Sequence, residues 1–487
     1  MFPILFRIPL PHTALKLWWA LAAVAVIAVI YGALAFRREE KTSGQVGLGV
    51  AAAAGIAAYF FRDKHWEAPN LPIYSYGVML GLSLVVGWYL TLGLADRDGL
   101  PKETMANCYV VTAVVALLGS RVLYVATNME QFHSLGDVLS IRKGGYVAYG
   151  GFLGGFLGSW LYLRSQSLKL LPWADVAVPS LASGLLITRI GCYLFGCDFG
   201  KRLPEKAPAF LQKLGTFPHW AGKALDAGDG SPAFVRHREL FQGTPAGAEL
   251  LKNNHSLPVH PTQIYESIVG LGLLGLLLWQ RKHKRFDGQL FFLFVFAYGA
   301  IRFLLEIVRD DEERGEWGPA MAQHILVPAC LVLFALAFTF GISLGITNLR
   351  ARMIARVASF LPAVLAYFAL APAKFGEVAT VRLSTSQLIG LVTGLLVSYF
   401  YAKAWVDAGK GEVAKTKAAK KKKLEEEEEE EDDEEDEEEE LAPTKDDKKP
   451  AAKPAGKKTD PKPSGKKGEK DKPKAADEDD DEAPEPA

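Results

Sequence analysis

Two arginines lie where this sequence is otherwise strongly apolar. Arg189 follows the apolar stretch 176–187 and precedes several glycines, and Arg302 lies within the apolar segment 290–308. A cation in so apolar a setting is costly without an anionic partner, and glycine lets the backbone approach a ligand closely. Because a guanidinium can bind two oxygens of a phosphate or carboxylate at once, the two arginines predict a bound anion.

The polar residues around Arg302 recur at four-residue spacing, which places them on one face of a helix. They are Tyr298, Arg302, Glu306 and Asp310. Arg302 and Glu306 could form an ion pair that only neutralises itself. Since ion pairs within a membrane are costly and usually mark a substrate path, we favour a functional pair.

A glycine-rich segment surrounds Tyr149. Glycine recurs at every fourth position from Gly150 to Gly158, a pattern typical of helices that pack backbone against backbone. Close packing does not account for the glycine pairs at 144–145 and 150–151, on either side of Tyr149. These pairs favour an irregular start to the helix that lines a ligand site.

Two further motifs have simpler explanations. In the motif 260–266, Pro261 suits the first turn of a helix and Glu266 lies near the positive end of its dipole. The start of a helix and a ligand site are equally good interpretations of this motif. Arg121 and Tyr124 share a face of another predicted helix, where the arginine can reach the membrane interface.

Only four cysteines occur, and Cys192 and Cys197 are the only close pair. If this pair faces an oxidising compartment, a local disulfide is expected. A catalytic thiol activated by Arg189 is the less favoured alternative. The sequence shows no cluster of metal ligands, so we expect no metal and no cofactor.

The elements that position these residues are predicted to be membrane helices, because eleven segments meet a criterion of about twenty apolar residues. The first lacks a cleavage site and is expected to be retained. Clusters of lysine and arginine fall in every second loop, which places the N-terminus outside and the C-terminus in the cytoplasm. The expected helices are 15–36, 45–61, 72–94, 105–126, 146–163, 171–188, 262–279, 289–308, 320–344, 353–371 and 387–405.

The charged residues, 55 basic and 55 acidic, are unevenly distributed. Much of the charge follows Trp405, where lysine-rich and acidic runs cannot bury enough apolar surface to fold. We therefore expect a disordered cytoplasmic tail over 406–487. The long segment 198–260 contains enough apolar residues to form a small periplasmic head or lid.

Four motifs resemble, in order and spacing, those of the bacterial prolipoprotein diacylglyceryl transferases. The resemblance covers approximately residues 73–340. It implies an all-α polytopic membrane protein with a seven-helix core, assigned to 72–345, and one added two-helix hairpin in each of 1–71 and 346–405. The motifs are Gly144–Gly158, Arg189–Gly191 with Gly196, His260–Glu266, and Tyr298–Arg309 followed by Gln323.

Members of this family transfer the diacylglyceryl group of phosphatidylglycerol to the lipobox cysteine of a preprolipoprotein, forming a thioether and releasing glycerol phosphate. By resemblance, Arg189 would hold the lipid phosphate, and Arg302, Glu306 and Tyr149 would act at the reacting centre. The substrate-binding residues implied by the resemblance are Tyr76, Arg121, Gly150, Gly151, Gly191, Gly196, His260, Gln263, Tyr265, Glu266, Tyr298 and Gln323.

Two positions depart from the family pattern. Tyr149 stands where many members have histidine, and Cys192 where many have asparagine. Without that histidine, Tyr149, Glu306 or the arginine-polarised leaving phosphate is left to assist removal of the thiol proton.

The chain is thus expected to lie in the bacterial inner membrane, with phosphatidylglycerol, a lipobox peptide and the bilayer as partners and no nucleic acid. The main alternative is a protein that binds or transports anionic phospholipid without breaking a bond. A weaker alternative is an enzyme of the same fold that acts on another acceptor thiol, with 198–260 shaping the acceptor site.

Overall fold

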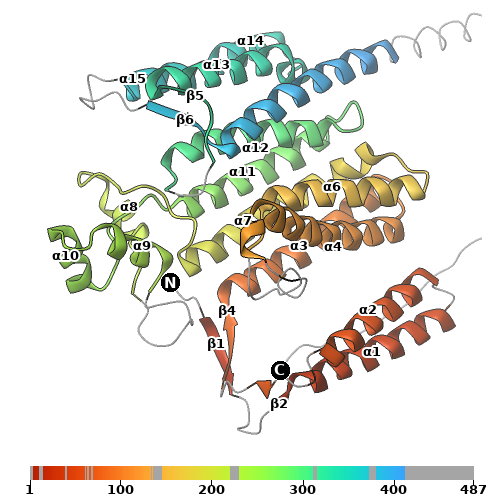
Figure 1. Cartoon of the computed structure of the whole chain (residues 1–487). Helices are drawn as coiled ribbons and strands as arrows, with labels where there is room; N and C mark the ends of the chain where they lie inside the picture. Colours follow the sequence, from red (N-terminus) through yellow and green to blue (C-terminus); the bar gives the residue numbers. More distant parts are fainter. Residues whose placement is uncertain are drawn as a thin grey trace, which may run out of the picture. The chain divides into compact units, whose positions relative to one another are not determined.

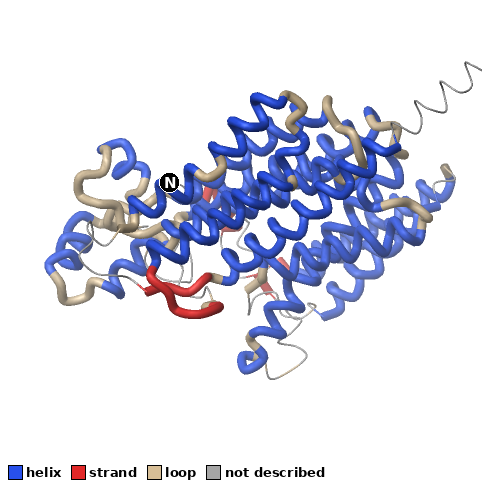
Figure 2. The backbone as a smooth tube through the Cα atoms, turned by 90° about the horizontal axis from the view of Figure 1, so that it is seen from above, coloured by secondary structure: helices blue, strands red, loops and turns tan. Residues whose placement is uncertain are grey.

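The computed structural model describes residues 4–9, 15–38, 41–60, 62, 65–66, 70–132, 134, 145–219, 230–310, 315–371 and 380–411. This part of the chain consists mainly of long helices that run alongside one another, as expected of an all-α protein (Figures 1 and 2). The long helices are α1 (Leu17–Arg37), α2 (Lys41–Phe60), α3 (Ser75–Arg97), α4 (Lys102–Thr127), α6 (Ala148–Ser165), α7 (Leu170–Phe195), α11 (Thr262–Arg281), α12 (Gln289–Val308), α13 (Gln323–Phe340) and Thr385–Gly411.

Among the described residues, nine helices are long and apolar enough to cross a membrane, two fewer than the eleven expected. The chain is therefore a multi-pass membrane protein, and the count of eleven is not confirmed. In α2, the apolar part Gly44–Phe60 is shorter than a membrane span. In α6, the glycines and Arg164 lower the mean hydropathy of the helix. One of the nine, Leu349–Ala369, is divided into α14 (Leu349–Ala358) and α15 (Leu361–Ala369).

Short strands hold together the two ends of the α1–α2 hairpin. β1 (Ile4–Pro9) pairs antiparallel with β4 (Asn70–Tyr74), and β2 (Leu15–Lys16) pairs with β3 (His65–Trp66). The segments before α1 and after α2 therefore lie next to each other. An inserted hairpin would have this arrangement, because it leaves the start of α3 undisturbed.

α7 packs against α3, α11 and α12, and glycines allow two of these approaches to be close. A Cβ atom added at Gly191 would lie 3.0 Å from Cβ of Met79 in α3. One added at Gly270 of α11 would lie 2.5 Å from the backbone nitrogen of Leu186. Small residues at helix contacts are typical of membrane bundles, where close backbone packing stabilises association.

A buried carboxylate fixes the N-terminal end of α12 against α7. Asp175, which is fully buried, accepts hydrogen bonds from the backbone nitrogens of Gly288 (2.7 Å) and Phe291 (3.0 Å). Its carboxylate also pairs with Lys284 at 3.0 Å. The orphan N–H groups at the start of α12 are thereby satisfied from a neighbouring helix, which sets the direction in which α12 presents Arg302.

The segment after α7 folds into three short helices around a small core. The core side chains are Phe199, Phe217, Ala233 and Val259. Ser256 supports this core because its hydroxyl accepts a hydrogen bond from the backbone nitrogen of Phe217 (2.9 Å). The helices are α8 (Ala209–Leu214), α9 (Pro232–Leu240) and α10 (Pro245–Asn253).

The last described helix, Thr385–Gly411, packs on α12. A Cβ atom added at Gly299 of α12 would lie 3.0 Å from the carbonyl oxygen of Gly390. Before this helix, β6 (Thr380–Leu383) pairs antiparallel with β5 (Trp317–Ala322). The helix continues past the expected boundary at Trp405, so residues 406–411 are helical and were wrongly assigned to the tail. The rest of the expected tail, 412–487, lies outside the described residues.

Candidate active site

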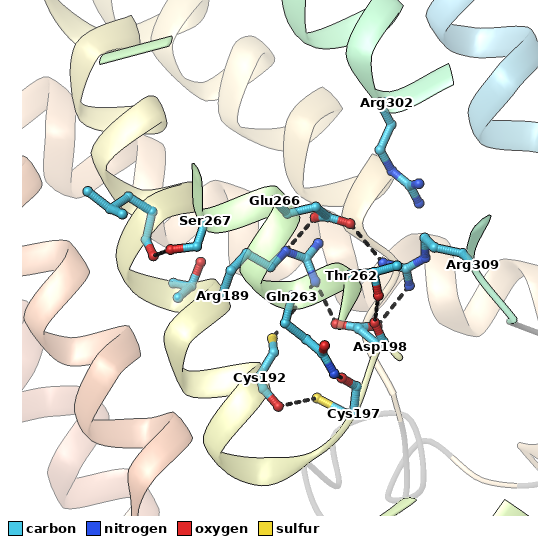
Figure 3. Close-up of polar contacts among 12 residues, drawn as sticks. Arg189, Cys192, Cys197, Asp198, Thr262, Gln263, Glu266, Ser267, Arg302 and Arg309 are labelled. Atoms are coloured by element: carbon cyan, nitrogen blue, oxygen red, sulfur yellow. Dashed lines mark hydrogen bonds and ion pairs between the residues drawn. The ribbon is translucent and has the colours of Figure 1, made fainter. Parts of the chain in front are cut away.

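The ends of α7, α11 and α12 meet in a cluster of two arginines and two carboxylates. Arg189 of α7 pairs through Nε with Oε2 of Glu266 in α11 (2.6 Å) and through Nη1 with Oδ2 of Asp198 (2.6 Å). Arg309, which follows α12, pairs with Oε1 of Glu266 (2.9 Å) and Oδ1 of Asp198 (3.0 Å). Each carboxylate bridges both guanidiniums, so the four side chains form a closed charge ring (Figure 3).

The charge ring is largely buried and electrically balanced. The side chains of Glu266 and Arg309 are 1% and 6% exposed, whereas that of Asp198 is 35% exposed. Burial raises the pKa of Asp198, but the guanidiniums of Arg189 and Arg309 outweigh this effect and hold the pKa below its ordinary value. Because two positive and two negative charges cancel, the ring joins three helix ends without a net buried charge.

The way α7 ends explains how Asp198 reaches the ring. Gly196 adopts a left-handed conformation with φ of +84°, which glycine accepts without strain. The carbonyl oxygen of Cys192 accepts hydrogen bonds from the backbone nitrogens of Gly196 (2.7 Å) and Cys197 (3.2 Å). Asp198 also has a positive φ, of 56°. These turns reverse the chain and bring the Asp198 carboxylate back to Arg189, which is nine residues earlier.

Arg302 and Glu306 form the predicted ion pair on one face of α12. Nη1 of Arg302 donates a hydrogen bond to Oε2 of Glu306, whose side chain is 3% exposed. Figure 3 shows Arg302 reaching from α12 toward the charge ring. The predicted stripe stops at Glu306, because α12 ends at Val308 and Asp310 is not part of the helical face.

Two of the predicted tyrosines lie near these charges. Tyr298, one turn before Arg302, lies within electrostatic range of Arg302, Glu266 and Tyr149. Tyr149 is in the first turn of α6. Tyr76 of α3 lies within electrostatic range of Arg189 and Asp198 and is 39% exposed. The structure thus brings Tyr76, Tyr149 and Tyr298 to the same region as the two arginines.

A cavity of about 610 Å³ lies beside the Arg302–Glu306 pair. It is lined by Glu306, Arg309 and Gln323, the last of which begins α13. Part of its wall comes from the segment that includes β6 and the start of the last helix. These residues are Thr380, Val381, Arg382, Leu383, Ser384 and Gln387.

Within the motif 260–266, Glu266 is the member that joins the charge ring. Gln263 is fully buried and donates through Nε2 to the carbonyl of Cys197, which ties α11 to the end of α7. Nδ1 of His260 and the hydroxyl of Tyr265 are 3.3 Å apart. Burial and the charge of Lys201 lower the pKa of His260. The contacts of Gln263 agree with a structural role at the start of the helix.

The glycines before and within α6 contribute mainly to packing. A Cβ atom added at Gly150 would lie 2.3 Å from the carbonyl oxygen of Gly119 in α4, whereas one at Gly151 would make only ordinary contacts. Arg121 donates through Nη1 to the carbonyl of Gly145 (3.2 Å) and lies over the ring of Phe132. Gly144 lies outside the described residues. Gly150 therefore packs closely against α4, as the four-residue repeat of glycines predicted, and its contact with a ligand stays a prediction.

Asp198 and Arg309 were not predicted as site residues. Arg309 is seven residues after Arg302, which returns it to nearly the same side of the helix, and this spacing is the signal that could have found it. Asp198 follows Gly196 and Cys197 in a turn whose direction cannot be read from residue types alone. Its role depends on two positive φ angles that the folded chain provides.

The thiols of Cys192 and Cys197 are free, so the expected disulfide is not formed in this structure. Their sulfur atoms and a carboxylate oxygen of Asp198 lie within 4.8 Å of one another. The spacing of Cys192 and Cys197 predicted that the two thiols lie close together, but it did not include Asp198, which the reversal of the chain after α7 brings to them.

The family model described as prolipoprotein diacylglyceryl transferase matches residues 64–342. A relative from Clostridium tetani (strain Massachusetts / E88), named phosphatidylglycerol–prolipoprotein diacylglyceryl transferase, is 28% identical over 246 residues, covering 50% of this chain and 84% of the relative.

Two further relatives have similar values. A protein of the same name from Bacillus cereus (strain ATCC 14579) is 27% identical over 241 residues, covering 49% of this chain and 78% of the relative. Phosphatidylglycerol–prolipoprotein diacylglyceryl transferase 2 from Clostridium perfringens (strain 13 / Type A) is 28% identical over 253 residues, covering 52% and 84%. Because the family match spans more than half of the 487 residues and contains the whole charge ring, the chain belongs to the prolipoprotein diacylglyceryl transferase family.

Proposed function

We propose that this protein transfers the diacylglyceryl group of phosphatidylglycerol to the cysteine thiol of a preprolipoprotein lipobox and releases glycerol phosphate. The observation that carries the proposal is the charge ring at the ends of α7, α11 and α12, with the Arg302–Glu306 pair beside it. Family membership supplies the reaction, and these charges match what the reaction requires.

The chemistry needs cations close to the leaving phosphate. When a thiolate attacks the glyceryl carbon, a carbon–oxygen bond breaks and its electron pair goes to the phosphate oxygen. Preorganised donors that meet this growing charge lower the barrier most in a site of low polarity. Arg189 and Arg302 are the proposed donors, and both are held in position by carboxylates.

Arg189 can hold a phosphate while remaining in the charge ring. A guanidinium has five N–H donors in a planar arrangement. The two carboxylates contact Nε and Nη1 of Arg189. The remaining N–H donors of the guanidinium can bind a lipid phosphate, and the charge ring fixes the plane of the guanidinium. Arg309 is proposed as a positioning residue that acts through Glu266 and Asp198.

The acceptor thiol must lose a proton before it attacks. Tyr149, which replaces the histidine of many members, and Glu306 are the candidate groups, as is the departing phosphate. Glu306 pairs with Arg302, so proton uptake by Glu306 would weaken its hold on the arginine during the step. The substrate-binding roles of Tyr76, Tyr298 and Gln323 are proposed from their positions around these charges.

The proposed setting is the bacterial inner membrane, with the N-terminus outside and the C-terminus in the cytoplasm. Basic residues in alternate loops support this orientation. The charge ring would then lie at the outer face, where secreted acceptors arrive. The segment 198–260 is proposed as a head beside the site, and the core of the enzyme as residues 72–345 between two added hairpins.

Acyl-labelled phosphatidylglycerol and a synthetic lipobox peptide test the proposal. The purified protein should move label into the cysteine peptide and leave a matched peptide with serine unlabelled. Lipid that binds to the protein without any labelled cysteine peptide would instead identify a phospholipid-binding protein and contradict the proposal.

A further inference from the structure

The turn that ends α7 places two thiols side by side at the edge of the charge ring. Cys192 lies in the last turn of α7, and Cys197 follows the left-handed Gly196. In this type of helix ending, the residues that flank the reversed chain come into contact. The Sγ atoms of Cys192 and Cys197 and an oxygen of Asp198 lie within 4.8 Å of one another.

This group has the composition of a metal site. Thiolates are preferred ligands of zinc and other soft or borderline metals, and a carboxylate oxygen can be a further ligand. The thiol of Cys192 is buried, whereas Cys197 and Asp198 are partly exposed, which leaves a side open to a cation. Three protein ligands with an open fourth position are the arrangement of catalytic zinc sites, whereas structural sites are closed by four protein ligands.

The charges also permit a dication to bind here. The charge ring itself is neutral, with two arginines and two carboxylates. Cysteine binds metal as thiolate, so each thiol releases one proton when the metal enters. Two thiolates cancel the charge of a divalent cation, and the buried cluster therefore gains no net charge.

We propose that Cys192, Cys197 and Asp198 bind a thiophilic divalent cation, such as Zn²⁺ or Cd²⁺, and that this binding inhibits lipid transfer. Oδ2 of Asp198 contacts Arg189 at 2.6 Å, and Nη1 of Arg189 lies 3.8 Å from Sγ of Cys192. A cation that takes Asp198 as a ligand competes with Arg189 for that carboxylate and removes one of the two ion pairs that hold the guanidinium in place. The inhibitory part of the inference rests on the proposed function, whereas the binding part does not.

Zinc binding can be measured on the full-length protein, purified in detergent with a tag that contains no histidine. After reduction and desalting, competition against a chromogenic zinc chelator should show one tightly bound Zn²⁺ per chain. Cys192→Ser and Cys197→Ser should each weaken binding by more than the roughly 10–100-fold typical of a second-shell change. Cys108→Ser and Cys330→Ser alter buried thiols elsewhere and serve as matched controls.

X-ray absorption of the zinc-loaded protein provides a readout that is independent of folding defects in the variants. It should show two sulfur ligands at about 2.3 Å. Reduced wild-type protein that binds no zinc, zinc without sulfur ligands, or unchanged binding after Cys192→Ser would each overturn the site.

Transfer assays test the inhibition. Zn²⁺ should abolish transfer by the wild type and a chelator should restore it, whereas Cys197→Ser should keep the same rate with and without Zn²⁺. Zinc bound to both thiols without any loss of transfer would contradict the inhibitory role. If the metal-free wild type transfers no lipid, the proposed function fails, and the zinc-binding measurements still decide the site.

Discussion

The guanidinium of Arg189 contacts two carboxylates and the thiol of Cys192, so its geometry is constrained on several sides. Arg189→Lys retains the charge but loses the planar arrangement that contacts Glu266, Asp198 and a phosphate together. We predict a loss of transfer of roughly 100-fold or more, comparable to removing a donor that stabilises a developing oxyanion. The measurement is lipid transfer at matched protein level, with membrane insertion checked by protease accessibility. Near wild-type activity would contradict the phosphate-binding role.

Arg302 and Glu306 are predicted to act as a unit. Glu306→Gln or Arg302→Gln leaves one buried charge without its partner, which typically costs about 3–5 kcal/mol. The double variant should recover much of the stability and still lack transfer, since it has no cation for the phosphate. Thermal unfolding in detergent and lipid transfer should be measured side by side for all three variants. Transfer near the wild-type rate by the double variant would show that the pair is only structural.

Residue types and spacing were sufficient to predict the Arg302–Glu306 pair, because four-residue spacing on a helix determines which side chains meet. Arg189 was predicted as a site residue from its apolar surroundings and Glu266 from the family resemblance, but neither argument showed that they pair. Their contact depends on how α7 crosses α11, which is a tertiary property. Asp198 was missed for a related reason, since a left-handed turn determines where its side chain lies.

At the scale of elements, two adjacent glycines make a matched test of helix packing. Gly150→Ala would place a Cβ atom 2.3 Å from a backbone oxygen of α4, whereas Gly151→Ala would place one 3.6 Å from a backbone oxygen. Overpacking typically costs 1–3 kcal/mol, so Gly150→Ala should lower the thermal stability by about that amount and Gly151→Ala should not. Equal stability of the two variants would contradict the α4–α6 contact. Lost transfer with normal stability in Gly151→Ala would instead support its predicted substrate contact.

The long apolar helices were predictable because their hydropathy reflects the lipid that surrounds them. Their ends were less predictable. α7 was expected to end at 188 and continues to Phe195, since Arg189 remains helical when Glu266 and Asp198 neutralise it. The break between α14 and α15 was also missed, although Pro362 in the first turn of α15 is a residue type that suits the start of a helix.

At the scale of the whole chain, the charged C-terminal segment is predicted to be dispensable for the reaction. It follows the last described helix, which ends at Gly411. A chain truncated after Lys415 should therefore transfer lipid at a rate within about twofold of the full-length protein, since the removed sequence has no core-forming residues. Rates should be compared in membranes at matched protein level. Abolished transfer by the truncated chain would assign the tail a role in the reaction.

The central claim is that this protein breaks the bond between the glyceryl group and the phosphate while it forms a thioether. The most direct test is the product balance for purified protein in vesicles of phosphatidylglycerol with a labelled headgroup. We predict that the lipobox peptide gains the mass of one diacylglyceryl group and that one glycerol phosphate is released for each peptide modified. Unmodified peptide, with intact phosphatidylglycerol bound to the protein, would contradict the account.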